Sequence, residues 1–147
     1  MAVTALAGGP HQRLDEAAVR AFVREQLAGL DLDGRSLCLV IPDATRACPL
    51  PLLLGAIEES VADRVRSCTA VVALGTHAPM DEDALRALVG VDGLEAVNHE
   101  WWDDATFADV GTLDAATVGH LSAGRLDEAV AVRVNRLVVE SDVTIIV

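Results

Sequence analysis

The stretch Ser36-Leu37-Cys38-Leu39-Val40-Ile41-Pro42-Asp43-Ala44-Thr45-Arg46 decides the fold class of this chain. Its first six residues form a short, nearly continuous apolar run, which is typical of a strand buried on both faces of a parallel sheet. Pro42 ends the run because proline has no N–H to donate to a neighbouring strand. A polar loop over residues 43–48 follows directly.

Helical and strand patterns alternate along the rest of the chain. Residues 14–30 have helical apolar spacing, and residues 69–74 repeat the buried-strand pattern and end at Gly75. We further expect helices over residues 50–65 and 81–90, strands over residues 96–99, 129–134 and 142–147, and a helical turn over residues 135–140. This order predicts an α/β fold with an open, mostly parallel sheet flanked by helices in Rossmann-like βαβ order.

Length and composition predict one folded domain. The chain has 147 residues, 52% of them hydrophobic, with a mean hydropathy of +0.37, and this composition excludes an intrinsically disordered protein. Residues 1–13 are expected to form a flexible N-terminal arm and residues 14–147 the α/β domain.

The charge balance narrows the possible partners. Against 23 acidic residues there are 11 basic ones, all arginine, which gives a net charge of −12. Such an excess of acid argues against a nucleic acid or an anionic membrane surface as partner. The lack of lysine excludes Schiff-base chemistry, a Walker lysine or a lysine-tethered cofactor in this chain. Three cysteines without CxxC spacing, and no signal peptide or membrane span, favour a reduced, cytoplasmic protein.

Two polar loops follow the two best-defined strands. One contains Asp43, Thr45 and Arg46; the other is Gly75-Thr76-His77. Ligands of open α/β sheets bind outside the carboxyl ends of the strands, so neighbouring strands would bring these loops to one crevice. There Arg46 can grip a carboxylate with two hydrogen bonds, and His77 can accept or donate a proton near neutral pH.

The supporting residues have simpler tasks. Asp43 can orient the imidazole or a substrate hydroxyl, and Gly75 permits a sharp turn and the close approach of a ligand. Together with Arg46 and His77, they suit a small hydroxy acid, whose carboxylate the arginine binds and whose hydroxyl proton the histidine takes.

Structural interpretations of the same residues stay open. Asp43 and Arg46 could form a loop ion pair, Asp43 could cap the helix that begins near Leu50, and His77 could be a buried turn residue. His99, in the segment Asn98-His99-Glu100-Trp101-Trp102, could line the site, bind a metal with His77, or belong to a packed edge where the indoles cover the core.

Other site chemistries find little support in the sequence. Cys48 is a candidate nucleophile by position alone, and His11 and His120 are expected to face solvent. No HExxH or paired CxxC spacing is present, so we expect no metal site made by this chain alone. Neither phosphate-binding glycine motif, GxGxxG or GxxxxGK[ST], occurs.

These motifs resemble the N-terminal domain of the nickel-pincer lactate racemase family. The resemblance rests on Ile41-Pro42-Asp43-Ala44-Thr45-Arg46, on Ala73-Leu74-Gly75-Thr76-His77 and on Val97-Asn98-His99-Glu100, and it covers residues 37–147. It implies interconversion of the two enantiomers of lactate or a related 2-hydroxy acid. By this resemblance His77 is the first of two catalytic histidines, and Arg46, Asp43 and Thr45 belong to the substrate pocket.

The resemblance also implies parts that these residues do not supply. In the family, the histidine takes the hydroxyl proton while a hydride passes to a nickel-pincer nucleotide. The second histidine, the nickel ligand and the lysine that carries the nucleotide lie beyond the last matching segment. We therefore expect a longer two-domain protein, with this chain inactive and free of nickel on its own. The alternatives are a non-catalytic module that binds a small carboxylate or a partner, and an epimerase of a sugar acid.

Overall fold

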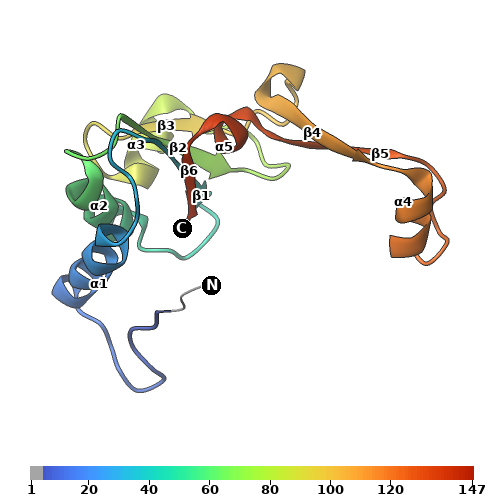
Figure 1. The fold of residues 1–147 in the computed structure, drawn as a ribbon. Coiled ribbons are helices and arrows are strands. Elements are labelled where there is room, and N and C mark those ends of the chain that lie inside the picture. The colour runs from blue at the N-terminus through green and yellow to red at the C-terminus, as the bar shows by residue number, and fades with distance from the viewer. Residues whose placement is uncertain (1–4) are drawn as a thin grey trace.

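A four-stranded, all-parallel sheet forms the centre of the computed structural model, which describes residues 5–147. Its strand order is β3-β2-β1-β6, and the bounds are β1 (Ser36–Pro42), β2 (Ser67–Ala73), β3 (Glu95–Asn98) and β6 (Val143–Ile146). The sheet confirms the predicted α/β fold class and supplies the strand order that the sequence left open (Figure 1).

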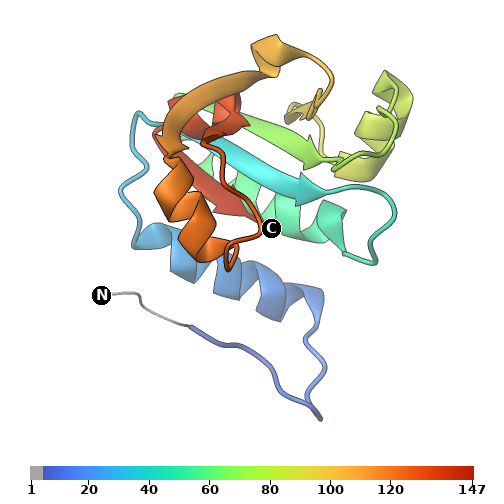
Figure 2. The ribbon, with the colours of Figure 1, turned by 90° about the vertical axis from the view of Figure 1, so that its right-hand side faces the viewer.

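The hydrophobic core lies between this sheet and a layer of helices: α1 (Glu16–Ala28), α2 (Leu50–Val61) and α3 (Glu82–Val89). Alternate residues of β1 enter the core, with Leu39 and Ile41 fully buried, and Leu54 of α2 packs in the same cluster. Figure 2 shows α1 running along the helical side of the sheet. This layer holds the strands rigidly and leaves their carboxyl ends free to carry loops.

Most expected elements are present with slightly different ends. The second helix stops at Val61 rather than residue 65, and β2 begins at Ser67, two residues before the expected strand. The third helix agrees closely: Asp81 caps it by accepting from the Ala84 N–H at 2.8 Å, and Gly90 ends it in the left-handed conformation.

A projecting hairpin is the main departure from the expected fold (Figure 1). It consists of β4 (Phe107–Leu113) and β5 (Val130–Asn135), which pair antiparallel as a separate sheet, with α4 (Ala115–Leu121) between them. The sequence predicted a strand near β5 but neither β4 nor α4. The Asp109-Val110-Gly111 segment of β4 breaks the alternation of apolar residues, and the strand register shifts there.

Residues 5–13 contain no helix or strand, only one isolated bridge between Gly9 and Gln12. Residues 1–4 of the expected arm lie outside the described part of the chain. The exposure of His11 and His120 agrees with the prediction for both.

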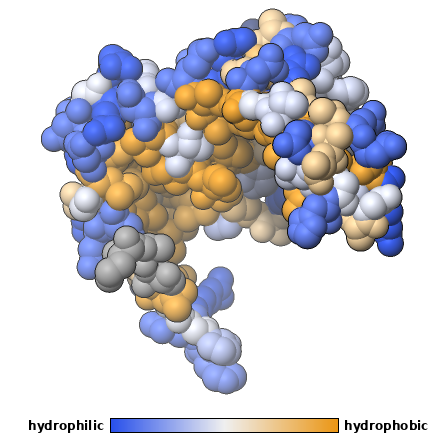
Figure 3. All heavy atoms as spheres, turned by 45° about the vertical axis from the view of Figure 1, so that its right-hand side comes forward, coloured by the Kyte–Doolittle hydropathy of each residue, from blue (hydrophilic) through white to orange (hydrophobic). Residues whose placement is uncertain are grey.

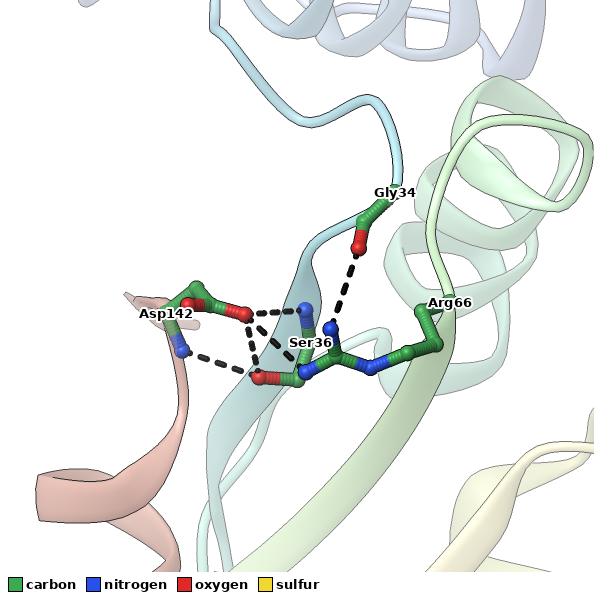
Figure 4. A network of polar contacts seen from close by, with 4 residues as sticks. All are labelled: Gly34, Ser36, Arg66 and Asp142. Carbon is green, nitrogen blue, oxygen red and sulfur yellow. Dashed lines mark hydrogen bonds and ion pairs between the residues drawn. The ribbon is translucent and has the colours of Figure 1, made fainter.

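The start of β6 is tied to the start of β1 by a polar network (Figure 4). One carboxylate oxygen of Asp142 accepts hydrogen bonds from the Ser36 N–H and hydroxyl, both at 2.8 Å, and from Arg66 at 3.2 Å. In return the Ser36 hydroxyl oxygen accepts from the Asp142 N–H at 3.0 Å. The hydrogen bonds from Ser36, aided by the charge of Arg66, lower the pKa of Asp142. After the hairpin and α5 (Arg136–Glu140), the network helps to return the chain to the central sheet.

Candidate functional site

The two predicted loops leave the same edge of the sheet. β1 and β2 pair in parallel with Pro42 opposite Ala73, so the loops that begin at residues 43 and 74 start side by side. The predicted convergence of Asp43 and His77 follows from this register: a carboxylate oxygen of Asp43 is hydrogen-bonded to Nδ1 of His77.

Asp43 is held by its own loop as well as by His77. Only 7% of the residue is exposed, and it is the single buried charged residue in the described part of the chain. Its second carboxylate oxygen accepts from the Thr45 N–H at 3.1 Å and from the Thr45 hydroxyl at 2.5 Å. These hydrogen bonds from Thr45, followed by the one from His77, lower the pKa of Asp43 from 3.8 to about 2. The carboxylate is therefore ionised throughout the neutral range.

His77 presents its other ring nitrogen to solvent. Its side chain is 57% exposed, so the interpretation of His77 as a buried turn residue is wrong. Because the ionised Asp43 only accepts hydrogen bonds, Nδ1 of the imidazole carries the proton and Nε2 of the neutral ring has a free lone pair. The His77 N–H donates to the Leu74 carbonyl at 3.0 Å, and Gly75 takes φ +60° within this turn, a conformation that suits glycine.

Arg46 is exposed, and its guanidinium forms no hydrogen bond or ion pair with any residue of the described range 5–147. A loop ion pair with Asp43 is therefore wrong, because that carboxylate is occupied by Thr45 and His77. Asp43 does not cap α2 either, since the residue at the start of that helix is Pro49. Within the described residues the Arg46 guanidinium is thus exposed and has no protein partner, three residues after Asp43 in the same loop.

His99 lies on the next strand-end segment but turns toward the hairpin. Its Nδ1 is 3.0 Å from the side-chain nitrogen of Asn135, and its ring meets Phe107 edge-on at 5.3 Å. Its side chain has no hydrogen bond to Asp43 or His77 within the described chain. The structure thus brings together Asp43, Thr45 and His77, and it places His99 at the base of the hairpin.

Two residues near His99 contact the His77 loop and were not predicted to do so. The indole N–H of Trp101 donates to the His77 carbonyl at 3.3 Å, and the Asn98 side chain forms two hydrogen bonds with the backbone of Met80. The indoles do not cover the core as one interpretation held, since Trp101 and Trp102 are 44% and 48% exposed. The sequence signal for these contacts was the polar-aromatic run over residues 98–102. Within that run His99, rather than Asn98 or Trp101, was the candidate site residue.

The remaining candidates add little to the site. Cys48 is half-buried and packs against the hydrophobic core, which does not suit a nucleophile. Thr76 is exposed in the His77 loop. Over residues 5–147 no three His, Cys, Asp or Glu side chains gather in a way that could hold a metal ion.

The candidate site lies at the surface, since Thr45, Arg46 and His77 are all exposed. One hollow of the described structure, about 660 Å³, follows α3 and the loop after it, and another, about 330 Å³, lies between β3 and α5. Neither is lined by Asp43, Arg46 or His77. No helix within the described range is both long and apolar enough to span a membrane.

A parallel sheet covered by helices, with a carboxylate-held imidazole at the carboxyl ends of its strands, belongs to the class of open α/β domains, whose ligands bind at that edge. The comparison with protein families is specific: the model of the lactate racemase N-terminal domain matches residues 8–147. The chain belongs to this family. The match begins well before residue 37, where the resemblance of the motifs begins.

Comparison with solved structures supports the fold. A crystal structure of a protein from Thermotoga maritima, from a structural genomics consortium, superimposes with a TM-score of 0.79 at 23% identity. The similarity covers 90% of this chain but 33% of that one, so this chain spans about a third of its structural neighbour. No match was found among curated proteins.

Proposed function

We propose that this chain is the substrate-binding and proton-transfer part of a 2-hydroxy-acid racemase or epimerase, with lactate as the leading substrate. The observation that carries the proposal is the hydrogen bond between the buried Asp43 carboxylate and Nδ1 of the exposed His77. It fixes which nitrogen holds the proton and directs the other to solvent. Membership of the lactate racemase N-terminal domain family supports the same assignment.

Each residue of the site has one task in this proposal. Arg46 binds the substrate carboxylate with its fork of N–H donors. Nε2 of His77 accepts the proton of the 2-hydroxyl group and returns it to the product. Asp43 stabilises the imidazolium formed in between without itself taking the proton, and Thr45 holds Asp43 in its orientation.

The nickel-pincer nucleotide that the family implies does not fit the residues of this chain. The chain has no lysine to carry the nucleotide, and residues 5–147 offer no metal-binding group of three side chains. We propose that a further domain of a longer protein supplies the nucleotide, its anchor and the second histidine. The chain alone is then expected to bind no nickel and to interconvert no substrate. Its own contribution is to bind the carboxylate of the substrate and to move the proton of the hydroxyl group.

Calorimetry tests the binding half of the proposal on the chain itself. We expect lactate to bind more tightly than propionate, because propionate lacks the hydroxyl group that His77 receives. Arg46→Ala should weaken lactate binding about tenfold or more, the usual effect of losing a charge-assisted pair. Arg24→Ala, which removes an exposed arginine of α1 at equal charge, is the matched control.

Three results would count against this proposal, two of them in favour of an alternative. Equal lactate affinity for the wild-type chain and the Arg46 variant would remove Arg46 from the site. Binding that depends on Arg46, without any interconversion of enantiomers by the longer protein, would instead favour a non-catalytic carboxylate-binding module. Interconversion of sugar acids but not lactate would favour an epimerase.

A further inference from the structure

We infer that Asn98 and Trp101 are positioning residues that fix the backbone on which His77 stands. This rests on the proposed function of His77. It adds residues 98–101 to the loops after β1 and β2 as a third segment that shapes the site. Asn98 ends β3 and Trp101 follows it in the polar-aromatic run, and neither side chain is hydrogen-bonded to Asp43 in the described structure.

Asn98 grips the end of the His77 loop with both ends of its amide. Its carbonyl oxygen accepts from the Met80 N–H at 3.1 Å, and its amide nitrogen donates to the Met80 carbonyl at 2.8 Å. A backbone N–H can only donate and a backbone carbonyl can only accept, so one amide orientation satisfies both contacts. The side chain thus binds Met80 as a neighbouring strand would, and it stops the loop from peeling away from β3.

Trp101 holds the middle of the same loop. Its indole N–H donates to the carbonyl of His77 itself at 3.3 Å. Trp101 is in turn fixed by a turn in its own segment, where its N–H donates to the His99 carbonyl at 2.9 Å. The His99 N–H then donates to the Val72 carbonyl at the end of β2, at 3.1 Å, so the segment that bears the indole is bound back to the sheet.

His77 is therefore held from both neighbouring strands. Asp43, after β1, binds its imidazole, and the segment after β3 binds its backbone. β2 lies between these two strands, with Val72 opposite Asn98, so both supports come from the same sheet edge. An exposed loop residue with only the side-chain contact would sample many backbone conformations, and the hydrogen bond to Asp43 would form for a smaller fraction of the time.

The tautomer of the His77 imidazole reports this positioning directly. In the neutral ring, pairing with Asp43 places the proton on Nδ1, whereas a free imidazole distributes it between the two nitrogens. Nitrogen-15 NMR of the labelled 147-residue chain distinguishes the two tautomers. In the wild-type protein we expect the Nδ1–H form of His77 to dominate. In Asn98→Ala and Trp101→Phe we expect it to fall toward the distribution of a free imidazole.

Matched controls separate positioning from general loss of structure. Trp101→Phe keeps an aromatic ring and removes the N–H donor, and Trp102→Phe makes the same change in the adjacent indole, which has no hydrogen bond with His77 within residues 5–147. Amide spectra and thermal unfolding of each variant should show a folded chain. If Asn98→Ala unfolds the protein, Trp101→Phe alone decides the outcome.

Three outcomes are distinguishable. A loss of the Nδ1–H form in the Trp101 variant, with Trp102→Phe unchanged, supports the inference. A dominant Nδ1–H form in every folded Asn98 and Trp101 variant, lost only in Asp43→Asn, overturns the inference and leaves the proposed function standing. A wild-type chain without a preference for Nδ1–H overturns the Asp43–His77 pair, and with it both proposals.

Discussion

Asp43 and His77 lie 34 residues apart in the sequence and share one hydrogen bond at the carboxyl edge of the sheet. The parallel pairing of β1 and β2 brings them together, since Pro42 and Ala73 end their strands opposite each other. A buried carboxylate and an exposed imidazole make an asymmetric pair, in which the aspartate is enclosed by the protein and the histidine is open to solvent. The fold thus decides both the contact and which ring nitrogen of His77 is paired with Asp43.

This pair should make stability depend on pH in the acid range. The folded-state pKa of Asp43 is lowered from 3.8 to about 2, so folding favours the ionised form. Its contribution is complete above 3.8 and is lost as the pH falls toward about 2. The difference in free energy of unfolding between the wild-type chain and Asp43→Asn should therefore shrink across this window.

Urea unfolding at several pH values measures that difference, with Asp63→Asn as an exposed control in the turn after α2. A difference that stays constant from neutral pH down to about 2 would contradict the role of the Asp43 charge.

A close contact between α3 and α2 predicts that Gly90 tolerates no side chain. A Cβ atom there would lie 2.8 Å from two side-chain carbons of Pro51, and Gly90 has φ +61°. Gly90→Ala should lower the free energy of unfolding by more than the 1–2 kcal/mol typical of left-handed backbone alone. Gly93→Ala is the control, because Gly93 has φ +86° but open space around it. Equal losses for the two variants, measured by urea unfolding, would show that the contact has no cost.

The core of β1 should be far more sensitive than the surface of the hairpin. Leu39 is fully buried, whereas Leu121 of α4 is 70% exposed. Leu39→Ala should cost about 2–5 kcal/mol of stability, because it leaves a cavity under the helices. Leu121→Ala should change stability by less than about 0.5 kcal/mol. A similar loss in both variants would contradict the assignment of the core.

We expect the Asp142–Ser36 hydrogen bonds to stabilise β6 locally, with little effect on the central strand β1. Asp142→Ala removes the acceptor for both the N–H and the hydroxyl of Ser36. Amides of residues 143–146 should then exchange faster with solvent, while those of the central strand β1 from Leu37 onward change little. Hydrogen exchange followed by NMR measures both. Unchanged exchange along β6 would show that its pairing with β1 is sufficient by itself.

The sequence predicted the parts of this structure whose signals are local. Apolar runs marked β1 and β2, and Asp81 and Gly90 marked the ends of α3. Because parallel strands align their carboxyl ends, the meeting of Asp43 and His77 could also be predicted once the two strands were taken as neighbours.

Other features depend on tertiary contacts that no local pattern carries. β4 is irregular at Gly111 and forms only through its pairing with β5. His99 is directed by Asn135 and Phe107 of the hairpin, so its place could not be read from the run that contains it. The contacts of Asn98 and Trp101 with the His77 loop depend on strand order, which the sequence left open.

Apolar surface gathers between the body of the domain and the hairpin (Figure 3). Large apolar residues with high exposure include Ile146 in β6, at 81%, and Val110 and Leu113 in β4. The structural neighbour has about two thirds of its length outside the matched region.

The role of His77 in proton transfer is the central claim, and chiral analysis of lactate tests it most directly. The assay uses the longer protein with its cofactor bound, starting from one pure enantiomer, and compares the wild type with His77→Ala. The wild type should form the other enantiomer, and His77→Ala should slow this by about a hundredfold or more at unchanged cofactor content. Near-normal interconversion by His77→Ala would contradict it.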